Sequence, residues 1–249
     1  MDFNHSVYKL KDFYRKLTVP QFTIVTGLIV IFLGTLVLST PFCSSQNVGL
    51  WEAFFTSTSA ITVTGLTVID IGSDLTIFGQ IFLAFMLLSG GLGLMAITTF
   101  LQGFVVKGAK LRTRLDKGKT LDEFGVGGIG RTFQSIAITA ASIISLGAFI
   151  LYFFGFININ NPWERLWVSI FHSISAYNNA GFSIWNTSIY EYRTNFVVNF
   201  VFIVLIVLGG LGWRVIDDIW THRNNLRYKK LTLHSKLVIR TTLNLILFG

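Results

Sequence analysis

Two short runs of the sequence have a composition suited to binding a cation through backbone carbonyl oxygens. Both lack charged residues and end in glycine; they consist of Thr62, Val63, Thr64 and Gly65, and of Asn178, Asn179, Ala180 and Gly181. Rings of backbone carbonyl oxygens can replace the hydration shell of a potassium ion. A glycine accepts a positive φ, which lets a carbonyl point toward the ion at little steric cost. These residues are therefore the candidate ion-binding residues, and K⁺ is the candidate ion.

An internal repeat places the two runs at equivalent positions. LWEAFFTSTSAITVTGLTV from Leu50 and LWVSIFHSISAYNNAGFSI from Leu166 align without a gap, at an offset of 116 residues. A GGLG motif also occurs twice, and its glycines are Gly90, Gly91 and Gly93, and Gly209, Gly210 and Gly212. Both copies run in the same direction, which is typical of a parallel repeat about an axis normal to a membrane.

The elements around the two runs resemble membrane spans. A bilayer core about 30 Å thick requires about 20 apolar residues per helix. Four uncharged segments are long enough, and they cover residues 21–39, 75–106, 132–156 and 195–213. The amphipathic stretch before each run is about ten to twelve residues long, which is the length of a re-entrant helix. The sequence therefore predicts an all-α membrane protein with repeated helix–pore-helix–filter-loop–helix units, as in potassium channels.

Non-helical backbone at membrane depth constrains what the two runs can do. Such backbone is tolerated only where protein covers it or where it lines a water-filled cavity. Two such stretches about one axis most simply line a shared pore. The preceding short helix directs its C-terminal end, with a partial negative charge, toward that axis. Both features favour a cation.

Composition and charge agree with this reading. The chain has 249 residues, of which 52% are hydrophobic and 13% charged, whereas soluble domains carry about 25% charged residues. This excludes disorder, a basic nucleic-acid-binding domain and most soluble enzymes. Of the 20 basic residues, 18 lie before residue 20, between 107 and 131, or between 214 and 240. The positive-inside rule therefore predicts a multi-pass protein with a cytoplasmic N-terminus. The net charge of +8 is then a topology signal, and no nucleic-acid partner is expected.

The segments TSAITVTGLTVID and AYNNAGF, together with the two GGLG helices, resemble the membrane subunit of the Trk/Ktr/HKT superfamily of potassium transporters, and the Ktr type most. The resemblance implies one pore made of four repeats, potassium selectivity and a place in the bacterial inner membrane. It also implies a dimer of pore subunits and a cytoplasmic nucleotide-binding regulatory ring. Gly65 and Gly181 would be filter glycines of the first two repeats.

This chain departs from that pattern because it holds two repeats. We expect a cytoplasmic N-terminus over residues 1–19, a first pore repeat over 20–106 and a cytoplasmic linker over 107–131. A second pore repeat follows over 132–220, and residues 221–249 form a linker and the start of a truncated third repeat. The chain then resembles an N-terminal half, whose partners are membrane lipid and either a second pore subunit or the missing C-terminal half. Arg214, Asp217 and Asp218 form a more charged helix end than the family pattern implies.

Several motifs have a plainer structural reading beside the functional one. GGLG favours close helix packing, or a bend near the pore. Residues 125–130 formally match a dinucleotide-binding motif, but no strand precedes them, so a flexible connector is expected. His172 is expected to be a satisfied buried histidine, because no ligand-spaced partner for a metal lies nearby. The charged segment 107–123 is either a solvated topogenic loop or a docking site for a regulatory partner.

The favoured hypothesis is potassium uptake across the plasma membrane by a pore-forming subunit whose loop carbonyls coordinate dehydrated K⁺. Na⁺ as a coupling or activating ion stays open, and no organic cofactor and no enzyme activity are expected. One alternative is a non-conducting truncated fragment that acts only in assembly with other membrane chains. Another is a secondary transporter for an organic solute, against which the parallel repeat counts.

Overall fold

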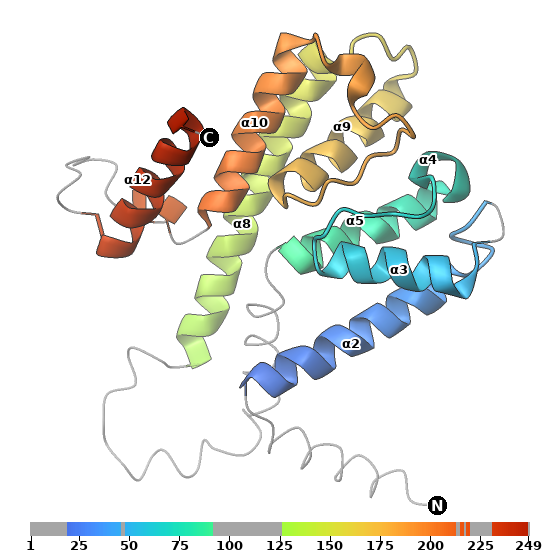
Figure 1. The fold of residues 1–249 in the computed structure, drawn as a ribbon, viewed down its shortest axis with the longest axis horizontal. Helices are drawn as coiled ribbons and strands as arrows, with labels where there is room; N and C mark the ends of the chain where they lie inside the picture. The colour runs from blue at the N-terminus through green and yellow to red at the C-terminus, as the bar shows by residue number, and fades with distance from the viewer. Residues whose placement is uncertain are drawn as a thin grey trace, which may run out of the picture. The chain divides into compact units, whose positions relative to one another are not determined.

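The computed structural model describes residues 19–45, 48–91, 126–212, 215–216, 218–219 and 231–248. The regular elements in these ranges are helices. In the same ranges, Ser44 and Leu75 form one isolated antiparallel bridge. The chain divides into two compact units, residues 1–138 and 139–249. The predicted all-α fold class is confirmed (Figure 1).

The first unit is built from α2 (Val19–Leu38), α3 (Leu50–Ile61), the short α4 (Ile71–Asp74) and α5 (Ile77–Gly91). The central helix α3 packs against both α2 and α5, and the three helices lie side by side in Figure 1. Small residues permit this approach: a Cβ at Gly34 of α2 would overlap the Met86 side chain and lie 3.2 Å from Ser57 Oγ. The short predicted helix is thus held between two longer apolar helices.

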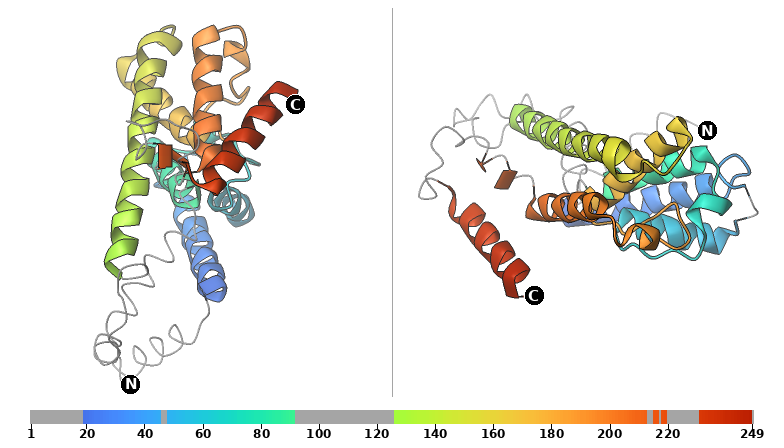
Figure 2. Two further views of the ribbon diagram at one scale, coloured as in Figure 1. Left: turned by 90° about the vertical axis from the view of Figure 1, so that its left-hand side faces the viewer. Right: turned by 90° about the horizontal axis from the view of Figure 1, so that it is seen from above.

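The boundary between the units falls within α8 (Val126–Ile150). The second unit contains the second half of α8, the π-helical turn η1 (Leu151–Gly155), α9 (Pro162–Tyr177), the 3₁₀ turn η2 (Tyr190–Tyr192), α10 (Phe196–Leu211) and α12 (Leu233–Phe248). Helix α10 packs against α9 and η1. It runs antiparallel to the second half of α8 (Figure 2): Gly147 faces Leu205, and Gly155, further along the chain, faces the earlier residue Val198. The order of long helix, short helix, loop and long helix is therefore the same as in the first unit.

The connector predicted at residues 125–130 is wrong for residues 126–130, which form the first turns of α8. Each glycine costs a helix only about 1 kcal/mol relative to alanine. The long apolar helix that follows therefore extends back through the glycine-rich run.

Helix length bears on the predicted spans. Among the described residues, Gln134–Gly155 is long and apolar enough to cross a bilayer, while Ile24–Leu38, Ile77–Gly91 and Phe196–Leu211 are apolar but shorter. The predicted run 75–106 continues past α5 outside the described residues. The N-terminal segment, the charged segment 107–123, Gly93, Arg214 and Asp217 also lie outside them.

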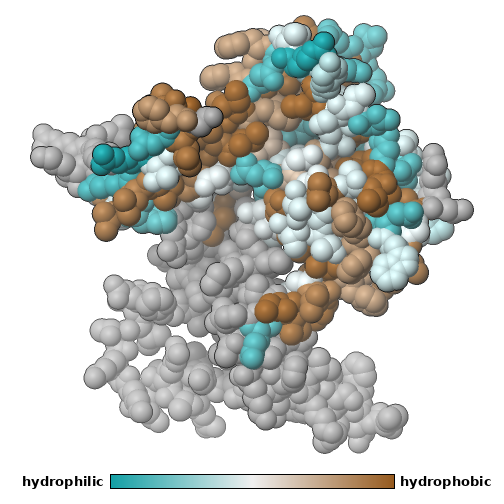
Figure 3. All heavy atoms as spheres, viewed as in Figure 1, coloured by the Kyte–Doolittle hydropathy of each residue, from teal (hydrophilic) through white to brown (hydrophobic). Residues whose placement is uncertain are grey.

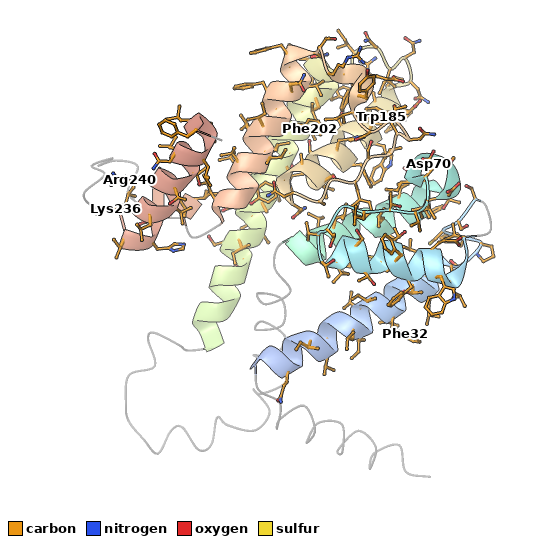
Figure 4. The ribbon with its side chains drawn as sticks, in the orientation of Figure 1. Phe32, Asp70, Trp185, Phe202, Lys236 and Arg240 are labelled. Atoms are coloured by element: carbon orange, nitrogen blue, oxygen red, sulfur yellow. The ribbon has the colours of Figure 1, made fainter. Side chains whose placement is uncertain are left out.

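The surface of the helices is apolar. Large hydrophobic side chains are exposed along α2 and α10 (Figure 3), among them Ile24, Phe32, Phe196 and Phe200. Figure 4 shows Phe32 on the outer side of α2. Exposed apolar surface of this extent marks contact with a membrane or with another protein.

The π-helical turn is stabilised from α10. Its bonds reach one residue further than those of an α-helix, as in Phe156 N–H to Leu151 C=O at 2.8 Å. Asn195 accepts a hydrogen bond from Val198 N–H at 3.2 Å, and its Nδ2 donates to Gly155 C=O at 3.2 Å. One side chain therefore caps α10 and satisfies a carbonyl at the end of η1.

Asn195→Ala is expected to lower the free energy of unfolding by about 1–2 kcal/mol, because it removes a helix cap and leaves a carbonyl unpaired. The measurement is thermal unfolding of the purified protein in detergent. Asn186→Ala, at an exposed loop position, is the matched control and should leave the midpoint unchanged. Equal midpoints for both variants would contradict the capping role.

Candidate ion-binding site

The two candidate loops have the same backbone conformation. After α3, Val63 and Gly65 have positive φ angles of 55° and 84°. After α9, Asn179 and Gly181 have positive φ angles of 55° and 71°. Both pairs are related by the offset of 116 residues found in the sequence, so the sequence repeat is also a repeat of backbone geometry.

The main-chain hydrogen bonds that end the two short helices also correspond. Val63 N–H donates to Ala60 C=O at 3.3 Å, and Thr64 N–H donates to Ser59 C=O at 2.9 Å. In the second unit, Asn179 N–H donates to Ala176 C=O at 3.1 Å, and Ala180 N–H donates to Ser175 C=O at 2.8 Å. This double pattern is a Schellman ending, in which a left-handed residue terminates the helix. Each loop therefore leaves its helix in the same direction.

Side chains attach each loop to the helix before it. Thr62 Oγ1 donates to Thr58 C=O, and Asn178 Nδ2 donates to Ile174 C=O, both at 2.8 Å. The Asn178 side chain is thus turned back onto α9 and is buried.

A serine in the last turn of each short helix then fastens the far end of the loop. Ser59 Oγ accepts from Leu66 N–H at 2.9 Å. At the equivalent position, Ser175 Oγ donates to Phe182 C=O at 2.6 Å.

The carbonyl groups of the loops are available to a ligand. Within the described part of the chain, none of the carbonyls of residues 62–65 or 178–181 accepts a hydrogen bond. An unpaired backbone carbonyl away from water is costly, so these oxygens need water or a cation. They also follow the C-terminal ends of α3 and α9, which carry partial negative charge. The arrangement is suited to coordinating a cation that has lost its hydration shell.

Positive φ angles at Val63 and Asn179 were not anticipated from the sequence, which pointed only to the glycines. A β-branched residue with positive φ is an outlier, and strain of this kind concentrates at functional sites. Asparagine is enriched in the left-handed region, so Asn179 carried a detectable signal. Val63 carried none.

The first glycine of each GGLG motif lies against the last turn of the short helix. A Cβ at Gly90 would overlap Ile61 C=O and lie 2.9 Å from Ala60 C=O, and a Cβ at Gly209 would overlap Tyr177 C=O. Gly210 has room, since its nearest neighbour is Asn179 Nδ2 at 3.8 Å. Close packing thus accounts for glycine at the first position of both motifs.

The other motif glycines behave differently. Gly91 is the last residue of α5, and Gly212, with a φ of 78°, follows the end of α10. A Cβ at Gly212 would meet nothing within 4 Å, so its glycine character serves the backbone conformation.

His172 lies in α9 with both ring nitrogens hydrogen-bonded. Nδ1 is 2.9 Å from Val168 C=O, and Nε2 is 3.1 Å from Ser183 Oγ. Over the described ranges, no group of three His, Cys, Asp or Glu residues is placed to hold a metal ion. These contacts support the reading of a satisfied buried histidine.

Acidic residues of the connecting segments are engaged locally. Glu52 accepts a hydrogen bond from Gly49 N–H at the start of α3, and Asp74 Oδ2 accepts from Asp70 N–H at 2.8 Å. Asp70 caps α4 in turn through Gly72 N–H at 3.0 Å (Figure 4). These carboxylates hold the connecting segments in place.

Comparison with known proteins gives consistent matches over nearly the whole chain. The family model TrkH, described as cation transport protein, matches residues 9–249. The Ktr system potassium uptake protein B of Bacillus subtilis is 33% identical over 233 residues, which are 92% of this chain and 51% of that protein. The protein of the same name from Vibrio alginolyticus is 30% identical over 231 residues, covering 92% and 50%. The potassium/sodium uptake protein NtpJ of Enterococcus hirae is 32% identical over 243 residues, covering 96% and 53%. The chain spans about half the length of these relatives.

Gly209→Ala is expected to displace α10 from α9 and to lower the free energy of unfolding by about 1–3 kcal/mol, because the new Cβ collides with a backbone carbonyl. Gly210→Ala is the control on the same helix, where a Cβ fits. Thermal unfolding of both purified variants measures the difference. A loss at Gly209 no larger than the change at Gly210 would refute the close-packing argument.

Val63→Asn is expected to stabilise the first loop by about 1 kcal/mol, because asparagine tolerates the left-handed conformation better than valine. The reciprocal Asn179→Val should destabilise the second loop by a similar amount. Both are measured as shifts in the thermal unfolding midpoint. Shifts of the same sign in the two variants would refute the strain argument.

Proposed function

The chain belongs to the TrkH family of cation transport proteins, and on this basis we propose that it forms part of a potassium-conducting pore in the bacterial plasma membrane. It is accordingly a membrane protein of a transport family, not of an enzyme class. Residues 62–65 and 178–181 supply carbonyl oxygens to a selectivity filter. K⁺ is the transported ion.

The unpaired carbonyls of the two matched loops carry this proposal. A potassium ion entering from water loses hydration, and carbonyl oxygens at the end of a short helix compensate for that loss. Movement then follows the electrochemical gradient, to which the membrane potential contributes about 2.3 kcal/mol per 100 mV for each charge. The chain's own residues supply the coordination and no covalent chemistry.

Two loops do not encircle an ion, so the pore needs further loops. The relatives are about twice as long as this chain, which supports a ring completed by further repeats or by a second pore subunit.

The helices span the membrane several times with the N-terminus in the cytoplasm, where the basic segments lie. Two relatives are named as components of a Ktr system, which supports a cytoplasmic nucleotide-binding regulatory ring as partner.

Sodium is a second ion to consider. One relative is named a potassium/sodium uptake protein, so Na⁺ is either a coupling or activating ion or a competitor at the same filter. Measuring uptake of each ion with and without the other distinguishes these roles.

Gly65→Ser and Gly181→Ser are expected to reduce the preference for K⁺ over Na⁺ by about tenfold or more, because a side chain at positive φ strains the loop and moves its carbonyls. The measurement is K⁺ and Na⁺ uptake by a potassium-uptake-deficient bacterial host that expresses the protein in its native assembly. Growth at limiting K⁺ gives a second readout.

Gly72→Ser is the control for this experiment, because Gly72 is exposed, lies in α4 and has no positive φ. An unchanged ion preference in both loop variants would refute the filter assignment. Lack of any K⁺-dependent growth with the unaltered protein would favour a non-conducting role in assembly.

A further inference from the structure

The two candidate loops differ in how firmly their far ends are held. Each returns along its own short helix, and one contact is shared: Ser59 with Leu66 in the first unit and Ser175 with Phe182 in the second. Among the described residues, a further contact one helical turn back is found for the second loop alone, between His172 and Ser183. Residues 172 and 175 are three apart and therefore share one face of α9. The returning chain is thus fastened at two successive points.

The hydrogen bonds around His172 form a directed chain. Val168 C=O can only accept, so Nδ1 carries the proton, and in the neutral ring Nε2 accepts from the Ser183 hydroxyl. Ser183 Oγ accepts in turn from Trp185 N–H at 3.1 Å. This series of hydrogen bonds, from Trp185 through Ser183 to His172, therefore connects the chain after the loop with the backbone of α9.

Three rings stack outward from this chain of bonds. The His172 and Trp185 rings are 4.4 Å apart at 25°, and the Trp185 and Tyr192 rings are 5.2 Å apart at 28°. Phe156 is fully buried and contacts all three edge-on, at 5.9, 5.3 and 4.9 Å. Figure 4 shows Trp185 beside α9.

The ring of Tyr192 stays neutral within this stack. Burial first, and then the carboxylates of Glu191 and Glu164, raise the pKa of Tyr192 above its ordinary value. The stack therefore carries no charge at its outer end at neutral pH.

At the equivalent positions, the described residues of the first unit keep the short turn, in which Ile69 N–H donates to Thr67 Oγ1 at 3.2 Å, but show no hydrogen bond from that turn to α3. Thr56 takes the place of His172, and its buried hydroxyl has no hydrogen-bond partner among the described residues. The Thr67 hydroxyl, equivalent to Ser183, donates to Ile69 C=O within its own loop at 2.9 Å. Ile69 itself stands where the second unit has Trp185.

We propose that His172, Ser183, Trp185 and Tyr192 are positioning residues that make the second loop the rigid member of the filter and thereby set its discrimination between K⁺ and Na⁺. The inference rests on the proposed potassium-pore function. A filter prefers K⁺ through the number and arrangement of its carbonyl oxygens. With the chain after residues 178–181 held at Ser175 and again at His172, these carbonyls cannot close around the smaller Na⁺. Among the described contacts, the chain after the first loop is held to α3 at Ser59 alone, so the first loop adapts to its neighbour.

The test compares His172→Thr, which copies the residue of the first unit, with Thr56→Val, which removes a hydroxyl that has no described partner. Both are made in the native assembly, with K⁺ and Na⁺ uptake measured separately. His172→Thr is expected to lower the K⁺/Na⁺ uptake ratio about tenfold, the effect of one lost hydrogen bond of ordinary strength. Thr56→Val should leave the ratio within about twofold of the unaltered protein.

Two further variants separate ring stacking from folding. Trp185→Phe keeps a stacked ring and should hold most of the selectivity, whereas Trp185→Leu should lose it as His172→Thr does. Hydrogen exchange of residues 178–185 in the purified protein is expected to accelerate in His172→Thr and Trp185→Leu only. This readout needs no transport, so it applies to a variant that assembles poorly.

The outcomes distinguish the two levels of the proposal. An unaltered protein without preference for K⁺ contradicts the proposed function itself. A selective unaltered protein whose preference survives both His172→Thr and Trp185→Leu overturns the positioning role. Exchange rates in residues 178–185 that do not change in these variants overturn it as well.

Discussion

A backbone carbonyl that accepts no hydrogen bond costs free energy wherever water is absent. The arrangement of the helices and loops in this chain depends on where such carbonyls lie. Both short helices end in the same left-handed turn, and the residues after that turn leave their oxygens unpaired among the described residues. The N–H groups of the turn donate hydrogen bonds back to the helix, so they are not available to the loop carbonyls. What remains is a run of acceptors without donors, which is the arrangement a dehydrated cation requires.

The neighbouring helices serve to hold these loops close to the helix they leave. Glycine at 90 and at 209 brings α5 and α10 into contact with the last carbonyls of α3 and α9, an approach that any side chain would prevent. Lipid does not drive apolar helices together as water does, so close packing of small residues takes over that role. For the same reason, hydrophobic side chains such as Phe32 and Phe200 face outward, while hydroxyls such as that of Ser173 are buried.

Repetition of the backbone does not extend to every side chain. The Schellman bonds and the serine contact occur in both units, whereas the stack built on His172 and Trp185 occurs in the second. In the pore that we propose, the two units have the same loop backbone but different side-chain support. The firmly held second loop then sets the spacing of the ligands, and the first loop adapts to the ion and to the neighbouring loops.

Much of this was determined by the sequence alone. The apolar runs, the offset of 116 residues and the glycines of VTGLT and NNAGF predicted the helices, the repeat and the loop residues, since these signals are local and periodic. Only the tertiary structure decided the left-handed turn at Val63, the overlap of Gly90 with Ile61 and the contact of His172 with Ser183. It also showed helix at residues 126–130, where a connector was predicted. The physical reason is that a strained φ or a close contact is stabilised by neighbours distant in sequence, and no residue type encodes those neighbours by itself.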